Sequence, residues 1–249
     1  MQITHATESA PGQVNEDYVC AGADWALVLD GATAVPGVDS GCVHDVRWLV
    51  RRLAAALSWR LIAPDGSSLP DVLAAAIKQV RAAHAGTCDL LNPDSPSATV
   101  AAVRCRGETT EYLVLGDSPV VLRRRDGDFT HIADERAAGL PGGRPYASGL
   151  VREHRNKPGG FWVASTDPGA AGQAITGTVP IAQITEAALF TDGVTRLADW
   201  YGHTWPGIFS CLRARGPAGL VELVRAAETQ QPPPYGKQHD DATAVYLYF

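Results

Sequence analysis

The sequence predicts a layered α+β fold, because segments typical of strands lie in both halves of the chain and enclose two segments typical of helices. The regular strand-helix alternation of a doubly wound sheet is missing from the sequence. Hydrophobic residues make up 45% of the 249 residues and charged residues 19%, a balance that suits a domain with a substantial core. We therefore expect residues 1–249 to form a single domain.

The first ninety residues are expected to hold one buried strand and two helices. The apolar run Trp25–Leu29 ends at Asp30-Gly31, as a buried strand does when it closes in a turn. Apolar residues then recur at helical spacing over 46–57 and again over 69–80, with a turn at 64–67 between them. We expect these two amphipathic helices to pack as an antiparallel pair.

The rest of the chain is expected to consist mainly of strands. Runs at 98–103, 111–117 and 119–125 are separated by Gly- and Asp-rich turns, which is typical of an antiparallel meander, and 125–128 is the clearest hairpin turn. Residues 137–160 show no periodicity and are expected to form an irregular surface segment. A helix is expected at 218–227, and further strands at 160–165, 186–190 and 242–248.

Charge and hydropathy exclude several classes of protein. The net charge of -6, without a block of Lys or Arg, argues against a nucleic-acid-binding surface or a patch for anionic membranes. The first residues lack a basic region followed by an apolar run, and no stretch approaches the roughly 18 to 20 apolar residues that span a bilayer. We expect a cytoplasmic monomer that binds neither nucleic acid nor membrane.

The cysteines and histidines give no local metal motif. The five cysteines are odd in number, far apart, and outside any C-x-x-C or Cys/His cluster, so neither a disulfide framework nor a zinc site is predicted and free thiols are expected. His44 and His84 are assigned to the predicted helices and interpreted as structural, whereas His5 and His239 lie nearer the acidic motifs.

Acidic residues stand beside the predicted strands in four short motifs. Asp30, Asp192 and Asp240 border runs that are expected to be buried, where an unpaired carboxylate carries a large desolvation cost. No Lys or Arg is adjacent to compensate, and hard divalent cations prefer carboxylate and carbonyl oxygens. The motifs therefore predict a hydrated centre of two ions, Mg2+ or Mn2+, although a single Asp-Gly pair also suits a β-turn. They are Asn15-Glu16-Asp17, Leu29-Asp30-Gly31, Thr191-Asp192-Gly193 and Asp240-Asp241-Ala242-Thr243.

The order of these motifs resembles the metal-dependent, type 2C family of protein serine/threonine phosphatases, and in particular its bacterial members. The resemblance covers essentially the whole chain and implies a four-layer sandwich of two antiparallel β-sheets flanked by antiparallel helices. That family carries an ED pair, a strand ending in DG, a GDS turn, a second DG, and a DN or DD before the last strand. All five occur here in this order, as Glu16-Asp17, Asp30-Gly31, Gly116-Asp117-Ser118, Asp192-Gly193 and Asp240-Asp241.

The resemblance implies roles for the first group of residues. Asp30 is expected to bridge both ions, and the carbonyl of Gly31 to bind one of them. Asp192 and Asp240 are expected to complete the coordination of the first ion. Asp30, Asp192 and Asp240 would thereby hold the water that attacks phosphorus.

For the remaining acidic residues the resemblance leaves alternatives. The resemblance implies that Glu16 and Asp17 serve the second ion, directly or through water, and the choice between the two stays open. Asp117 matches an aspartate that helps hold a weaker third ion in bacterial relatives, with a simple turn residue as the alternative.

The implied activity is hydrolysis of phosphoserine and phosphothreonine on proteins by a water bridged between two divalent ions. The expected partners are phosphorylated proteins of bacterial signalling, including a serine/threonine kinase or its targets. Two alternatives stay open: a weakly active or inactive phosphatase fold that acts as a binding or regulatory module, and a phosphatase of small phosphorylated molecules.

Several positions depart from the family pattern. Gly12 replaces an arginine that clamps the substrate phosphate, Ala32 a histidine proposed as general acid, and Pro119 an arginine after the GDS turn. The usual DG-x-GG run is here Asp30 to Ala34. Arg144, Arg152 and Arg155 are candidate replacement cations, with ordinary solvated arginines as the alternative.

Overall fold

The computed structural model describes residues 1–32, 37–63 and 66–249, and within them the strands form two five-stranded antiparallel sheets. The first sheet has the order β1 (Gln2–Glu8), β10 (Ala242–Tyr248), β9 (Ile184–Phe190), β6 (Val120–Arg124), β7 (Phe129–Ile132). The second has the order β2 (Tyr18–Ala21), β3 (Trp25–Gly31), β4 (Ala98–Arg106), β5 (Thr109–Leu115), β8 (Ile175–Pro180).

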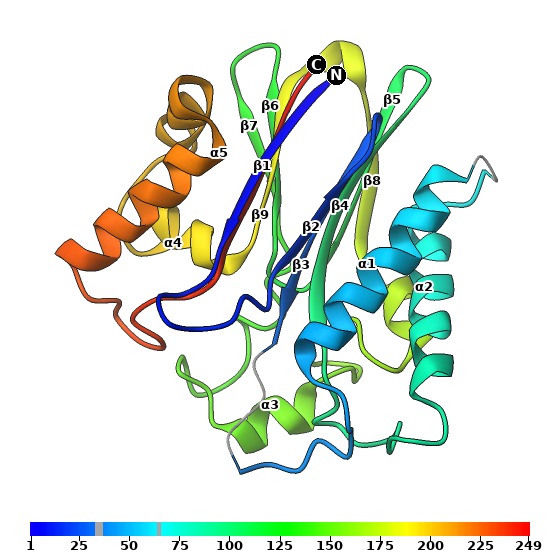
Figure 1. The fold of residues 1–249 in the computed structure, drawn as a ribbon. Helices are drawn as coiled ribbons and strands as arrows, with labels where there is room; N and C mark the ends of the chain where they lie inside the picture. The colour runs from blue at the N-terminus through cyan, green and yellow to red at the C-terminus, as the bar shows by residue number, and fades with distance from the viewer. Residues whose placement is uncertain (33–36, 64–65) are drawn as a thin grey trace.

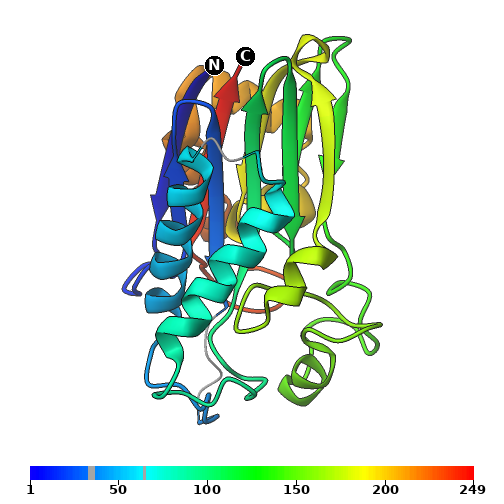
Figure 2. The ribbon, with the colours of Figure 1, turned by 90° about the vertical axis from the view of Figure 1, so that its right-hand side faces the viewer.

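Helices cover the outer faces of both sheets, so the structure confirms the four-layer sandwich (Figure 1). The antiparallel pair α1 (Val46–Ile62) and α2 (Leu69–His84) packs on the second sheet, as predicted (Figure 2). On the first sheet lie α4 (Asp192–Asp199) and α5 (Trp205–Gln230). No helix in the described part of the chain combines the length and apolar character needed to cross a bilayer.

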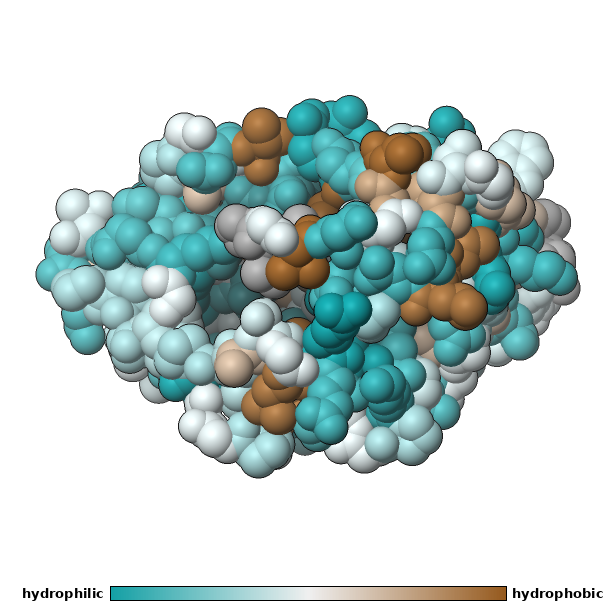
Figure 3. All heavy atoms as spheres, turned by 90° about the horizontal axis from the view of Figure 1, so that it is seen from below, coloured by the Kyte–Doolittle hydropathy of each residue, from teal (hydrophilic) through white to brown (hydrophobic). Residues whose placement is uncertain are grey.

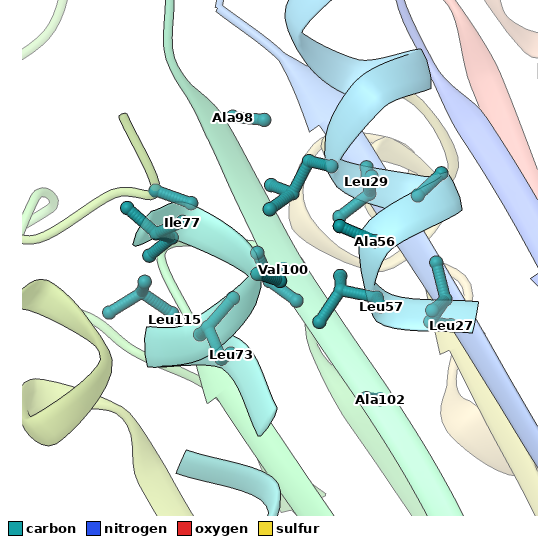
Figure 4. Packing of buried hydrophobic residues seen from close by; sticks show 14 of the residues in the cluster. Leu27, Leu29, Ala56, Leu57, Leu73, Ile77, Ala98, Val100, Ala102 and Leu115 are labelled. Carbon is teal, nitrogen blue, oxygen red and sulfur yellow. The ribbon is translucent and has the colours of Figure 1, made fainter. Parts of the chain in front are cut away.

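The strand β3 shows how the sequence positions the sheets. Successive side chains of a strand point to opposite faces, so Leu27 and Leu29 pack under α1 and α2 (Figure 4), while Ala26 and Val28 face the other sheet. All four are fully buried. Burial on both faces explains why this strand is a continuous apolar run rather than an alternating one.

The predicted meander is wrong, because its third strand belongs to the other sheet. The strands β4 and β5 pair as expected, but β6 crosses to the first sheet, where it lies between β9 and β7. Val120 and Leu122 join the core between the sheets and Val121 the core under α5. An apolar run buried on both faces fits the middle of either sheet, so the pattern could not select one.

The predicted strand at 160–165 is also wrong. This segment makes only isolated bridges, Ala98 with Ala164 and Arg155 with Phe161, before the chain turns into a 3-10 helix at Pro168–Gln173. The segment 137–160 is mostly irregular, as expected, but contains the short helix α3 (Ser148–His154).

The helix predicted at 218–227 belongs to the longer α5, which is kinked at Gly216. His84 ends α2, whereas His44 precedes α1 and lies outside the helix to which it was assigned. Thr33 and Ala34, within the altered DG-x-GG run, and the first half of the predicted turn at 64–67 lie outside the described residues.

Candidate metal centre

Aspartates from four separate segments gather at one end of the two sheets, where the connecting loops lie (Figure 1). Asp30 is the penultimate residue of β3, and Asp117 follows β5 by two residues. Asp192 follows β9 by two residues and begins α4, while Asp240 lies two residues before β10. The predicted convergence of strand-end carboxylates is thus present in the fold.

The carboxylates repel one another strongly. Burial, followed by the charges of Asp192, Asp17, Asp117 and Asp240, raises the pKa of Asp30 well above its usual value. Burial, followed by Asp117 and Asp240, raises the pKa of Asp192 to about 7. Such a concentration of buried negative charge and oxygen donors suits divalent cations, which remove the repulsion.

The start of α4 adds one contact to Asp30. The backbone amide of Asp192 donates to Oδ2 of Asp30 over 3.4 Å. This contact fixes the position of Asp30 next to Asp192, at a helix N-terminus whose partial positive charge opposes, without cancelling, the rise in the pKa of Asp30.

Two glycines allow these segments to meet. A Cβ at Gly193 would lie 1.9 Å from the carbonyl oxygen of Asp241, and one at Gly31 would lie 2.6 Å from the carbonyl oxygen of Glu16. Neither backbone can give way cheaply, so a side chain at either position would push the segments apart. The recurring Asp-Gly pairs therefore reflect close approach between distant segments.

Glu16 and Asp17 occupy different environments. The Asp17 carboxylate is 5% exposed and accepts hydrogen bonds from the hydroxyls of Thr191 and Thr243, over 2.8 and 2.7 Å. Burial raises the pKa of Asp17 to about 7, despite these two hydrogen bonds. Glu16 instead lines two cavities at the surface.

The two carboxylates of the pair Asp240-Asp241 also have different contacts. The Asp241 carboxylate accepts the backbone amides of Ala10 and Glu16, over 2.8 and 2.6 Å, and so anchors the loop that carries the acidic pair. Asp240 is held by Arg196 at 2.7 Å and by Lys237 at 3.2 Å. The charge of Asp240 acts on both Asp30 and Asp192.

Sequence reasoning missed a buried ionic network behind Asp240. Arg196 and Glu228 are 3% and 0% exposed and pair over 2.9 Å. Glu228 also accepts from Arg225 at 2.9 Å and contacts Nδ1 of His239 at 2.7 Å. One signal was available, since Glu228 continues the helical row of Val221 and Val224, where an apolar residue is expected.

A cavity of about 690 Å³ opens beside the cluster, on a face that is hollowed and mostly hydrophilic (Figure 3). Asp117, Asp192, Arg196 and Arg144 line it. Burial raises the pKa of Asp117, while the guanidinium of Arg144, 3.8 Å away, opposes this shift. The cavity therefore offers both carboxylates and cations to a ligand.

The three candidate cations differ in position. Arg144 lies on the cavity wall with its side chain 33% exposed. Arg152 pairs with Asp94 at 3.2 Å, and Arg155 donates to the backbone carbonyls of Pro93 and Ser95. Among the three, Arg144 alone lines this cavity.

Gly12 lies in an exposed turn with a φ of 72°. A side chain there would have open space but a strained backbone. Its neighbours Pro11 and Gln13 line a second cavity, of about 540 Å³, together with Lys237 and Asp240. The turn that carries Gly12 in place of the family's arginine therefore faces the cluster.

Comparison with known proteins gives one family and one fold. Residues 6–225 match the family described as protein phosphatase 2C. No curated protein sequence matches the chain significantly.

Solved structures share the fold at low identity. The catalytic domain of the serine/threonine phosphatase PstP, crystallised with two manganese ions, is 20% identical, with a TM-score of 0.59 over 98% of this chain and 96% of that one. MsPP from Mycobacterium smegmatis, in complex with cacodylate, is 18% identical, with a TM-score of 0.63 over 100% and 98%. Stp1 from Staphylococcus aureus is 12% identical, with a TM-score of 0.64 over 100% and 94%.

Proposed function

This chain belongs to the protein phosphatase 2C family, and we propose that its active centre is the carboxylate cluster around Asp30. Membership makes it a metal-dependent protein serine/threonine phosphatase, a hydrolase of phosphoric monoesters. The observation that carries the proposal is the convergence of Asp17, Asp30, Asp117, Asp192 and Asp240 at one end of the sheets. Burial raises the pKa values of Asp17, Asp30, Asp117 and Asp192.

The donors present fit two ions of Mg2+ or Mn2+, the metals expected from the family. Under this proposal Asp30 would serve both ions, the carbonyl of Gly31 would hold one of them, and Asp192 and Asp240 would also hold the first. Asp117, at the mouth of the large cavity, is proposed to help hold a weaker third ion.

We propose different roles for Asp17 and Glu16. The hydroxyls of Thr191 and Thr243 occupy one oxygen of Asp17 in the interior, which supports a role in positioning the cluster. Glu16 lines the cavities and is therefore the better placed of the two to serve the second ion.

When bound, two such ions acidify water and neutralise charge on the phosphoryl oxygens. The protein supplies the geometry. Asp30 lies against the first amide of α4, and Arg196 fixes Asp240 from behind. Uncatalysed hydrolysis of phosphate monoesters is extremely slow, so this fixed arrangement must contribute a large part of the rate enhancement.

The test is metal-dependent release of phosphate from a phosphothreonine peptide. We expect turnover with Mn2+ or Mg2+, complete loss on chelation with EDTA, and recovery when the metal is restored, because the carboxylates alone cannot neutralise the phosphoryl charge. Silence with every divalent metal would favour the binding module. A strong preference for small phosphorylated molecules over peptides would favour the other alternative.

Arg144 is proposed to bind the substrate phosphate in place of the arginine absent at Gly12. Its guanidinium lies beside Asp117 on the cavity wall. We expect Arg144→Leu to raise KM for a phosphopeptide about tenfold or more with little change in kcat, since a charge-assisted hydrogen bond contributes roughly 1.5–3 kcal/mol.

The matched control is Arg152→Leu, which removes a nearby arginine that pairs with Asp94. Its steady-state constants should stay close to those of the wild type. If KM and kcat of Arg144→Leu equalled those of the wild type, Arg144 would be an ordinary solvated arginine.

The finer expectations belong to the same proposal. We expect the substrates to be proteins phosphorylated by a bacterial serine/threonine kinase, the kinase itself included, and the enzyme to act in the cytoplasm as a monomer composed of one domain over 1–249. The family supports phosphoprotein substrates in general.

A further inference from the structure

Two cysteines and two histidines meet at the end of the helix pair α1 and α2. Cys42 and His44 precede α1, His84 is the last residue of α2, and Cys88 follows four residues later. The donor atoms of Cys42, His44 and His84 all lie within 4.8 Å of one another. Sγ of Cys88 is 3.0 Å from Sγ of Cys42 and 3.4 Å from Nδ1 of His44.

The expectation that the cysteines lie outside any Cys/His cluster is wrong for the folded chain. The two halves, C-x-H and H-x3-C, are about forty residues apart and meet only because α2 packs antiparallel to α1. Each half alone is too short to be recognised as a metal motif.

We propose that Cys42, His44, His84 and Cys88 form a tetrahedral site for one Zn2+ ion, separate from the carboxylate centre. Two thiolates and two imidazoles are a ligand set typical of closed structural zinc sites. Zinc bonds of about 2.3 Å to sulfur and 2.0–2.1 Å to nitrogen place neighbouring ligands roughly 3.3–3.8 Å apart. The distances of 3.7 and 3.4 Å from His44 to the two sulfurs fall in that range.

The sulfur-sulfur distance of 3.0 Å requires a small adjustment. The two thiols would separate by under about 1 Å to bind zinc, and would approach by about 1 Å to form a disulfide of about 2.05 Å. The two cysteines alone therefore do not distinguish a metal site from a disulfide, and the histidines decide between them.

His84 is the observation that favours a metal. Its side chain is 1% exposed, and neither ring nitrogen has a hydrogen-bond partner among the described residues. An imidazole buried without a partner is costly, and a bond to zinc would satisfy one nitrogen, whereas a disulfide would leave both unpaired.

The surroundings hold the ligands in place. The rings of His44 and His84 stack on Trp48, with centroids 3.9 and 4.5 Å from the indole. The Oγ1 atom of Thr87 lies 3.5 Å from Sγ of Cys88, and the backbone amide of His44 donates to Sγ of Cys42 over 3.4 Å.

The site would connect two parts of the fold. His44 also lines a small cavity of about 110 Å³ that reaches Glu16 and Ala32, at the edge of the carboxylate centre. Zinc would therefore fasten the segment that leads from the centre into α1 to the end of α2. This inference does not depend on the proposed phosphatase mechanism.

Cobalt(II) is the probe that separates the two sites. Metal-free, reduced protein is titrated with Co2+, and we expect thiolate-to-cobalt charge-transfer absorption that saturates at one equivalent and disappears when Zn2+ is added. The carboxylate centre offers oxygen donors and cannot produce this absorption. Asp30→Asn should therefore keep the band, even if that variant is inactive.

Variants identify the ligands. Cys88→Ser and His84→Gln should lose or strongly alter the band, while Cys105→Ser, a cysteine on β4, should keep it. Wild-type protein provides a test independent of variant folding: Zn2+ should slow alkylation of Cys42 and Cys88 by iodoacetamide at least tenfold and leave that of Cys20 unchanged. The proposal is overturned if reduced wild type gives no charge-transfer band, if Cys88→Ser retains it, or if zinc protects neither thiol.

Discussion

Asp30→Asn should lower the metal-dependent kcat by at least about a hundredfold, since a neutral amide cannot bridge and balance two divalent ions. The same change should make the metal-free protein more stable. Asp30 lies among the charges of Asp192, Asp17, Asp117 and Asp240, and removing its charge relieves their repulsion. Phosphate release and the melting temperature in EDTA, measured on the same preparations, test both effects.

The sign of the stability effect depends on pH. Burial and the neighbouring carboxylates raise the pKa of Asp30 above the value of about 3.9 expected in the unfolded chain. The folded state therefore holds its proton more tightly, and metal-free wild type loses stability as pH rises above about 4, until Asp30 is ionised in both states. Asp30→Asn lacks this contribution, so its advantage should be small at pH 4 and larger at pH 8.

The control is Asp24→Asn, which neutralises an exposed aspartate in the turn between β2 and β3. It should change neither activity nor the stability difference between the two pH values. If Asp30→Asn kept more than about a tenth of wild-type activity, or if it were less stable than wild type in EDTA at pH 8, the cluster would not be the repulsive metal centre described above.

Glu228→Ala should destabilise the protein by about 3–5 kcal/mol, because it removes one of the two carboxylates that pair with the buried guanidinium of Arg196. Glu228 is fully buried and also pairs with Arg225 and His239. Arg196 in turn holds Asp240, so activity should fall even where the variant is fully folded. Urea unfolding in EDTA gives the free energy, and phosphate release at low temperature gives the activity of the folded fraction.

Glu222→Ala is the matched control on the same helix. Glu222 pairs with Arg215, and their side chains are 68% and 51% exposed. Exposed pairs contribute about 0–1 kcal/mol, so this variant should stay close to wild type. Similar losses for the two variants would mean that the Glu228 network adds no more than a surface ion pair.

The sequence predicted the layered α+β fold and the gathering of carboxylates because their signals are local. Buried runs such as Trp25–Leu29 are followed directly by an aspartate, and each such motif can be recognised from a few consecutive residues. Contacts between separate elements could not be predicted in this way. The assignment of β6 to a sheet, the pairing of Arg196 with Glu228, and the meeting of Cys42 with Cys88 all depend on packing between segments distant in sequence.

The pairing of β1 with β10 also orders events during synthesis. Residues 2–8 hydrogen-bond to residues 242–248, and Figure 1 shows these two strands side by side. To form this strand pair, the chain must close a loop of more than two hundred residues. The pair forms late, because the chain loses the entropy of loop closure before the contacts between the strands can stabilise the fold. Asp240 reaches the cluster with that last strand, so a nascent chain carries an incomplete centre until β10 has emerged from the ribosome and docked.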